Sequence, residues 1–205
     1  MKNQTKIAIL GALALAAAGC ATLMGEDYDA KALATMKVSF KENGQAKLDR
    51  LNQDEVQRLC SEYVGDKKMP KDVAERIEKA QMATIKYPDK LVGDWKAGER
   101  IAQTGVGMQF SDDPKAPTGA NCYACHQLSK AELSFGTIGP PLYNFAKIRG
   151  YTPEMQKYAY GKIYNSEAYS ACSSMPRFGH MGILTEKQMQ DVTALLMDPE
   201  SPVNK

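Results

Sequence analysis

Cys122-Tyr123-Ala124-Cys125-His126 is the stretch of sequence that decides the fold of this chain. Two thiols three residues apart on a short helical turn can each add to one vinyl group of a haem. The histidine that follows lies beneath the iron and can supply its proximal nitrogen. The pattern C-x-x-C-H is the attachment signature of c-type haem. The motif therefore predicts one covalently bound haem c, attached at Cys122 and Cys125 and ligated by His126, and with it a redox function.

The two motif cysteines are also compatible with other chemistry. C-x-x-C alone suits a thioredoxin-like redox pair or half of a zinc site. A zinc site needs two more ligands, for which the sequence offers only His180, Cys60 and Cys172. A thioredoxin-like pair needs a βαβ pattern around it, and the sequence shows no strand-like segment. Haem attachment is therefore the favoured interpretation.

The N-terminus predicts export. Lys2 and Lys6 precede an uncharged run over residues 7–18, and small residues lead to Cys20. This is the pattern of a secretory signal peptide over residues 1–20, and it is too short for a convincing membrane-spanning helix. Export to the periplasm agrees with the motif, because bacteria attach c-type haem outside the cytoplasm. The residues before Cys20 resemble a lipoprotein cleavage site, so Cys20 is expected either to carry a lipid anchor or to be incidental to ordinary cleavage.

The charge balance argues against a nucleic-acid partner. The chain has 26 basic and 24 acidic residues. Residues 1–20 contain two lysines and no acidic residue. Without them, the mature chain has 24 basic and 24 acidic residues. Nucleic-acid binding would need a clustered basic excess. We expect no nucleic-acid partner and no transmembrane segment in the mature chain.

Two cysteines remain after the motif and the signal region are set aside. The chain has five cysteines, and the remaining pair is Cys60 and Cys172. In an oxidising compartment, two such cysteines most often form a disulfide. A bridge between them would close a loop of roughly a hundred residues, for which the chain-entropy model gives about 4–5 kcal/mol. The alternative is two buried free thiols.

Residues 21–90 are predicted to form a helical N-terminal extension. The segment is polar, charged and rich in helix-favouring residues. Asn52 and Glu55 resemble a capping box that opens a helix running to about Tyr63, and Pro70 stands where a second helix can begin. These helices are too thinly apolar for a domain of their own. We expect them to pack on the haem domain or on a partner protein.

Residues 91–205 are predicted to form a mono-haem domain. Asp94 is a suitable N-cap for its first helix, and Thr152-Pro153 suits the start of another. Thr185 and Gln188 form a capping box for the last helix. The order helix, C-x-x-C-H, loop, helix, C-terminal helix resembles that of class I cytochrome c. The chain is therefore expected to be all-α, with a class I cytochrome c fold and an N-terminal helical extension.

Three local matches carry this resemblance. Asp94-Trp95-Lys96-Ala97-Gly98-Glu99 looks like the first helix of the family, in which a glycine lets the terminal helices cross closely. Gly139-Pro140-Pro141-Leu142 resembles the loop whose proline carbonyl accepts the second N–H of the proximal histidine, which implies that Pro140 supports His126. Met175-Pro176-Arg177-Phe178-Gly179 resembles the segment that carries the distal ligand, which implies that His126 and Met175 are the two axial ligands.

Other distal ligands stay open at this point. Most of the 11 methionines lie at helical spacing, as core residues do. The closer rivals of Met175 are His180 and Met181, and ligation by two histidines can arise only through His180. A thioether stabilises ferrous iron, so a His/Met haem suits accepting electrons. The neighbouring Arg177 could attract an anionic partner or thiosulfate, pair with a haem propionate or lie on the surface.

Further segments resemble a more specific family. Residues 138–143, 164–169 and 174–179, with Leu184-Thr185, are similar to the sulfur-oxidation cytochromes of the SoxX family, the smaller subunits of SoxAX complexes. This resemblance implies a heterodimer with a SoxA-type cytochrome that couples thiosulfate oxidatively to a cysteine of the carrier protein SoxYZ. The catalytic site of this L-cysteine S-thiosulfotransferase type of complex would lie on the partner. The haem of this chain would accept electrons there and pass them to a small soluble cytochrome c.

Two other functions remain open. The chain could be a stand-alone periplasmic electron-shuttle cytochrome c, or the haem subunit of another periplasmic dehydrogenase, such as an alcohol or sulfite dehydrogenase. With Met175 bound, the iron has no open position for a substrate. No Ser/His/Asp or paired-carboxylate arrangement stands out in the sequence. We therefore assign no catalytic residue to this chain.

Overall fold

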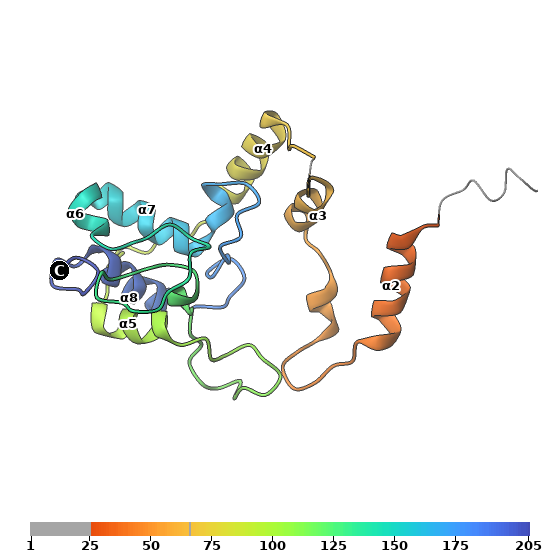
Figure 1. The fold of residues 1–205 in the computed structure, drawn as a ribbon, viewed down its shortest axis with the longest axis horizontal. Helices are drawn as coiled ribbons and strands as arrows, with labels where there is room; N and C mark the ends of the chain where they lie inside the picture. Colours follow the sequence, from red (N-terminus) through yellow and green to blue (C-terminus); the bar gives the residue numbers. More distant parts are fainter. Residues whose placement is uncertain (1–25, 66) are drawn as a thin grey trace, which may run out of the picture. The chain divides into compact units, whose positions relative to one another are not determined.

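The computed structural model describes residues 26–65 and 67–205, and these residues are helical (Figure 1). They contain no β-strand, only an isolated bridge between Asn43 and Ala46. The predicted all-α fold is therefore confirmed. The predicted signal peptide and Cys20 lie outside the described residues. None of the helices over the described ranges is long and apolar enough to span a bilayer.

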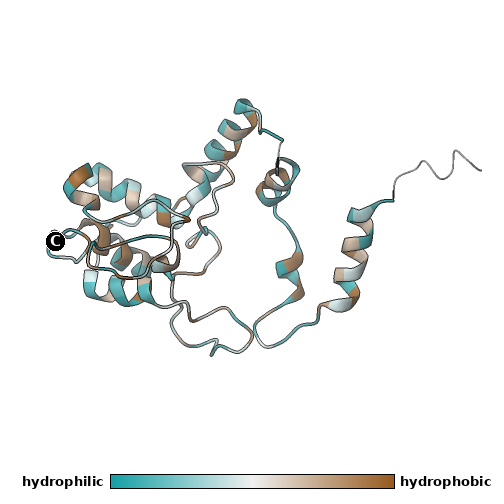
Figure 2. Cartoon of the chain, in the orientation of Figure 1, coloured by the Kyte–Doolittle hydropathy of each residue, from teal (hydrophilic) through white to brown (hydrophobic). Residues whose placement is uncertain are grey.

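The chain divides into two compact units, with the division after Lys41. The described part of the first unit is essentially helix α2 (Tyr28–Ser39). The Asp27 carboxylate caps this helix by accepting a hydrogen bond from the Ala30 N–H at 2.9 Å. None of its residues is buried by the described chain, and hydrophobic and hydrophilic residues are mixed along it (Figure 2). Helix α2 therefore has no apolar face of its own.

The second unit begins with η1 (Leu48–Leu51), α3 (Glu55–Glu62) and α4 (Lys71–Met82). Helix α3 opens with a capping box formed by Asp54 and Gln57, not by the predicted Asn52 and Glu55. The prediction was wrong by two residues because the N–H of Asn52 closes the preceding turn on the carbonyl of Asp49. The chain then has to extend before another helix can begin. Helix α4 begins directly after Pro70, as predicted.

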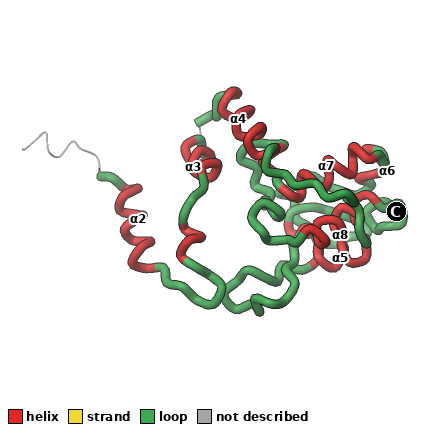
Figure 3. The backbone as a smooth tube through the Cα atoms, turned by 180° about the vertical axis from the view of Figure 1, so that it is seen from behind, coloured by secondary structure: helices red, strands yellow, loops and turns green. Residues whose placement is uncertain are grey.

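The remaining elements are α5 (Trp95–Gln103), η2 (Cys122–Ala124), α6 (Phe145–Arg149), α7 (Pro153–Tyr164), η3 (Ser166–Ala168) and α8 (Glu186–Met197). The predicted caps Asp94, Thr152 and Thr185 each accept a backbone N–H of the first turn of their helix. Long loops, interrupted only by the short turn η2, separate α5 from α6, and another long loop separates η3 from α8 (Figure 3). These loops carry most of the candidate site residues.

Helices α5 and α8 lie against each other (Figures 1 and 3), and they approach closely at Gly98. A Cβ atom at Gly98 would collide with the carbonyl oxygen of Asp191 in α8. The Asp191 carboxylate in turn accepts the N–H of Asp94 at 2.7 Å and pairs with Lys187. The glycine thus has the role that the resemblance implied, since it allows the two terminal helices to approach backbone to backbone.

The core lies between α5, α7, α8 and the loops that pack on them. Its central side chains are fully buried, with Tyr160 and Leu195 at 0% exposure. The C-terminal tail belongs to the same core, because the Asn204 side chain accepts the N–H of Ala146 and donates to the carbonyl of Leu196, both at 3.0 Å. Further members of the core are Ala102, Leu128, Phe145, Ile163, Phe178, Met189 and Val192.

Candidate functional site

The C-x-x-C-H motif forms the turn η2 and its continuation. Asn121, in the left-handed region with φ 45°, turns the chain into η2. The carbonyl of Cys122 then accepts the N–H groups of both Cys125 and His126, at 3.1 and 2.9 Å. This bifurcated turn presents two thiols and an imidazole together, which is the arrangement predicted from their spacing.

These three side chains line a cavity of about 540 Å³. Met175, from the loop before α8, lines the same cavity. Burial in apolar surroundings raises the pKa of the Cys122 thiol to about 12. The apolar wall of the cavity is formed by Ile138, Leu142, Phe145, Ala159, Ile163, Phe178 and Leu196.

His126 is held from two sides. Its Nδ1 lies 2.7 Å from the carbonyl oxygen of Pro140, so Nδ1–H can donate there and leave Nε2 to face a metal. Gly139 lies against the ring, because a Cβ atom at that position would be only 2.7 Å from Nε2. The Gly139 N–H also donates to the carbonyl of Cys125 at 2.8 Å. The loop before α6 therefore fixes both the tautomer and the orientation of the imidazole.

Gly139→Ala should disturb this arrangement. Its methyl group would force the His126 ring or the 139–141 loop to move, which weakens the hydrogen bond to Pro140. Loss of such support lowers metal affinity about 10- to 100-fold, so we expect a fall in the fraction of purified protein that carries haem. Haem staining per mole of protein measures it. Gly65→Ala is a suitable control, since a new Cβ at Gly65 would meet no atom within 4 Å, although its positive φ of 70° makes the substitution at least as demanding for the backbone. Equal haem content in both variants would contradict the role of Gly139.

The structure separates the three candidates for a distal ligand. Met175 lines the cavity, whereas His180 and Met181 do not. The His180 Nδ1 lies 3.3 Å from the Thr84 hydroxyl, and burial together with the positive charge of Arg177 lowers the pKa of its imidazole. The Met181 side chain is 49% exposed.

Met175 is also fixed through its backbone. Its carbonyl accepts a hydrogen bond from the Ser166 hydroxyl, and its N–H donates to the Ser173 hydroxyl at 3.2 Å.

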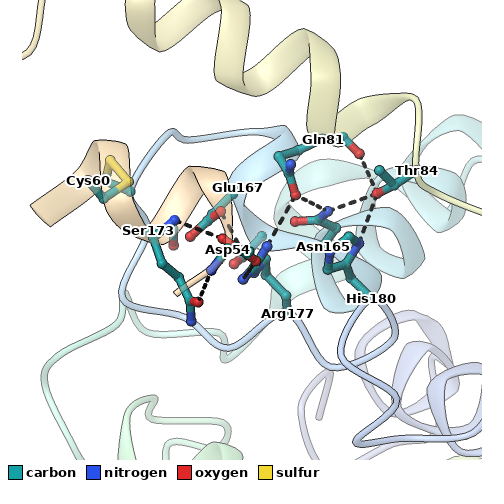
Figure 4. A network of polar contacts seen from close by, with 12 residues as sticks. Asp54, Cys60, Gln81, Thr84, Asn165, Glu167, Ser173, Arg177 and His180 are labelled. Carbon is teal, nitrogen blue, oxygen red and sulfur yellow. Dashed lines mark hydrogen bonds and ion pairs between the residues drawn. A yellow bond between two sulfur atoms is a disulfide. The ribbon is translucent and has the colours of Figure 1, made fainter. Parts of the chain in front are cut away.

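Arg177 is not a surface residue and does not line the cavity. It is 6% exposed and its Nη2 donates to the Asp54 carboxylate at 2.6 Å (Figure 4). Its Nε lies 3.7 Å from the carboxylate of Glu167, whose pKa is raised by burial. None of the three roles considered for Arg177 fits this position, because the guanidinium is already paired inside the protein.

The cationic side chains among the described residues that line the cavity are Arg149 and Lys162. Both were missed from the sequence. Burial lowers the pKa of Lys162, and its ammonium group donates to the carbonyl of Ser166 at 3.1 Å. These two side chains have the charge and position to pair with acidic groups at the rim of a bound cofactor. No local motif marks them, since helices α6 and α7 bring them to the cavity.

Cys60 and Cys172 form a disulfide, with their Cα atoms 5.5 Å apart. The bond joins α3 to the loop three residues before Met175. Since these cysteines bond to each other and His180 lies against Thr84, the additional ligands that a zinc site would need are not at the motif.

The donor set of the cavity suits haem c. Two thiols for thioether bonds, one oriented imidazole and one thioether line a single, mostly apolar space. That combination would provide covalent attachment, two iron ligands of different softness and a low-dielectric pocket, and these features determine how a protein binds a haem and sets its reduction potential. The residues present therefore fit this cofactor.

Two comparisons with known proteins bear on the site. The cytochrome c family matches residues 110–198, a range that contains the C-x-x-C-H motif and Met175. An uncharacterized lipoprotein of Aquifex aeolicus (strain VF5) is 40% identical over 156 residues, which cover 75% of this chain and 73% of that protein. The similarity to the Aquifex protein therefore reaches well beyond the range matched by the family.

Proposed function

This chain carries a cytochrome c domain and belongs to the family of the Aquifex lipoprotein, and from that premise we propose that it is a mono-haem electron-transfer protein. Cys122 and Cys125 bind the haem covalently, and His126 and Met175 ligate its iron. The observation that carries the proposal is the cavity lined by all four of these side chains.

The chain's own residues favour electron transfer over substrate chemistry. Haem c supplies a one-electron couple of its iron. His126 and Met175 would hold the iron of a bound haem, and the hydrogen bond to Pro140 would make the imidazole a stronger donor. Ile138 lines the cavity and is 76% exposed, so one edge of the cavity is also molecular surface. A redox partner can approach the cofactor at this edge.

The finer proposal is the role of a SoxX-type subunit. In this role the chain accepts electrons from the haem of a SoxA-type partner, which couples thiosulfate to a cysteine of SoxYZ, and passes them to a small cytochrome c. The resemblance of residues 138–143, 164–169 and 174–179 supports this reading. A turnover assay with thiosulfate, carrier and both subunits tests it. Activity that is unaffected when this chain is omitted would contradict the subunit role. The remaining functions would then be a stand-alone electron shuttle or the haem subunit of another dehydrogenase.

Export with a lipid anchor is part of the proposal. The similar Aquifex protein is named a lipoprotein, and Cys20 of this chain stands at the end of a segment that resembles a signal peptide. We propose that Cys20 becomes the lipidated N-terminus of a periplasmic protein. Incorporation of labelled fatty acid, lost in Cys20→Ala, would support the anchor, whereas equal labelling of both proteins would contradict it.

Met175→Ala tests the distal ligand. We expect the weak far-red charge-transfer band of ferric sulfur-ligated haem to disappear. The reduction potential should fall by about 0.1 V or more, within the roughly 0.8 V range that axial ligands span. Absorption spectroscopy and a potentiometric titration measure the two effects. Met181→Ala, at an exposed methionine six residues further on, should change neither. Persistence of the band in Met175→Ala would show that another residue binds the iron.

A further inference from the structure

We propose that residues 42–90 act as a clamp that holds Met175 against the cavity, with Arg177 as its main positioning residue. The distal loop is defined here as residues 170–181, the irregular segment that contains Met175. The inference rests on the proposed ligation of the iron by Met175. It assigns a task to the extension, whose helices were expected only to pack on the haem domain or on a partner.

The extension is attached to the distal loop before Met175. The disulfide between Cys60 of α3 and Cys172 fixes the loop three residues upstream of the methionine. One residue earlier, the N–H of Ala171 donates to the carboxylate of Glu78 in α4 at 3.0 Å. Helices α3 and α4 therefore both hold the same side of the loop.

The extension is also attached to the loop after Met175. The Arg177 guanidinium reaches Asp54 at the start of α3 at 2.6 Å and the Gln81 side chain in α4 at 3.4 Å (Figure 4). Met175 thus lies between two fixed points, residues 171–172 on one side and Arg177 on the other. The same two helices provide the partners on both sides.

A polar network extends the clamp toward η3 and the end of the loop. The Asn165 side-chain amide donates to the Gln81 side chain at 2.9 Å and to the Thr84 hydroxyl at 3.0 Å. Thr84 lies 3.3 Å from His180 (Figure 4). The C-terminal end of α4 therefore joins the distal loop to the segment that follows α7. His180 serves in this network and not at the cavity.

Among these contacts, the ion pair between Arg177 and Asp54 is the strongest candidate for the one that positions the distal loop. Arg177 is almost fully buried, and Oε2 of the neighbouring Glu167 accepts no hydrogen bond from the described residues. Burial tends to raise the pKa of Asp54, but the N–H of Gln57 and the guanidinium of Arg177 lower it below its usual value. Asp54 is therefore the charged, hydrogen-bonded partner that keeps Arg177, and with it the loop, in place.

The test uses the haem-loaded full chain and free imidazole as a probe that competes with Met175 for ferric iron. A looser loop gives up the methionine more easily, so imidazole should bind more tightly. For Arg177→Gln and for Asp54→Asn we expect about a tenfold gain in imidazole affinity, which corresponds to about 1.4 kcal/mol. Asn caps helices as well as Asp does, so Asp54→Asn keeps the start of α3 and removes only the charge. The double variant should gain little beyond either single change, because the two residues act as one pair.

Arg58→Gln is the matched control, since it removes an exposed arginine–glutamate pair on the same helix. Its imidazole affinity should equal that of the unmodified protein. A merely structural role for Arg177 predicts a lower unfolding midpoint with unchanged imidazole affinity, and that result for both Arg177→Gln and Asp54→Asn would overturn the clamp. If Arg177→Gln fails to fold, Asp54→Asn alone decides. Absence of the far-red band from the unmodified protein would instead overturn the proposed ligation, and the clamp with it.

Discussion

A chain in which Cys122 and Cys125 are both replaced by serine is expected to contain no covalently bound haem and to lose most of its ordered helix. Without the cofactor, the cavity of about 540 Å³ would be left to solvent or would have to collapse. Cavities in protein cores cost about 24 cal/mol per Å³, which gives on the order of 10 kcal/mol here as an upper limit, because part of the cavity opens to solvent. Domains are stable by only about 5–15 kcal/mol. The haem is therefore expected to be required for folding.

Haem staining after denaturing electrophoresis and far-UV circular dichroism measure the two expected losses. Ala124→Ser is the control, because it changes an exposed variable position of the motif and leaves both thiols in place. It should keep the haem and the helix signal. A double serine variant that retains stained haem, or one that loses haem but keeps its full helix signal, would contradict the prediction.

Helix starts could be predicted from the sequence because their causes are local. Asp94, Thr152 and Thr185 each bind a backbone N–H two or three residues ahead, so the residues that decide a start lie within one turn. The start of α3 was misplaced for an equally local reason. A short 3₁₀ turn ending at Asn52 competes with the helix for the same residues, and the composition of the segment does not reveal it.

The roles of Arg177 and His180 could not be predicted because their partners are far away in the sequence. The partner of Arg177 precedes it by 123 residues, and Thr84 precedes His180 by 96. A local pattern places both residues beside the methionine and suggests ligation or surface charge. The tertiary structure assigns both instead to a buried polar network.

The packing of the extension was left open for a related reason. In α3 and α4 only Val56, Ile77 and Gln81 are buried, too few for an apolar stripe to indicate a partner surface. Residues 42–90 are held to the rest of the second unit by a disulfide, an ion pair and side-chain hydrogen bonds. Such contacts involve polar side chains and cysteines, so the spacing of hydrophobic residues in the sequence does not reveal them. Leftover cysteines were therefore the main signal in the sequence that connected the extension to the distal loop.

Cys60→Ser combined with Cys172→Ser is expected to lower the free energy of unfolding by about 5 kcal/mol, because the bridge spans 112 residues and constrains the unfolded chain accordingly. The native structure offers little to offset that loss, since the extension buries few apolar side chains. Urea unfolding of the haem-loaded protein, followed by circular dichroism, measures the change as a shift of the midpoint.

Chemical reduction provides an internal control for this second prediction. A thiol reductant should move the midpoint of the unmodified protein to that of the double serine variant, and it should leave the variant unchanged. An unmoved midpoint in both experiments would show that the bridge adds no stability. Since the Arg177–Asp54 pair is intact in the double variant, the far-red band should survive the loss of the disulfide at low urea. Loss of the band without urea would mean that the covalent link holds Met175 in place, and that the ion pair is secondary to it.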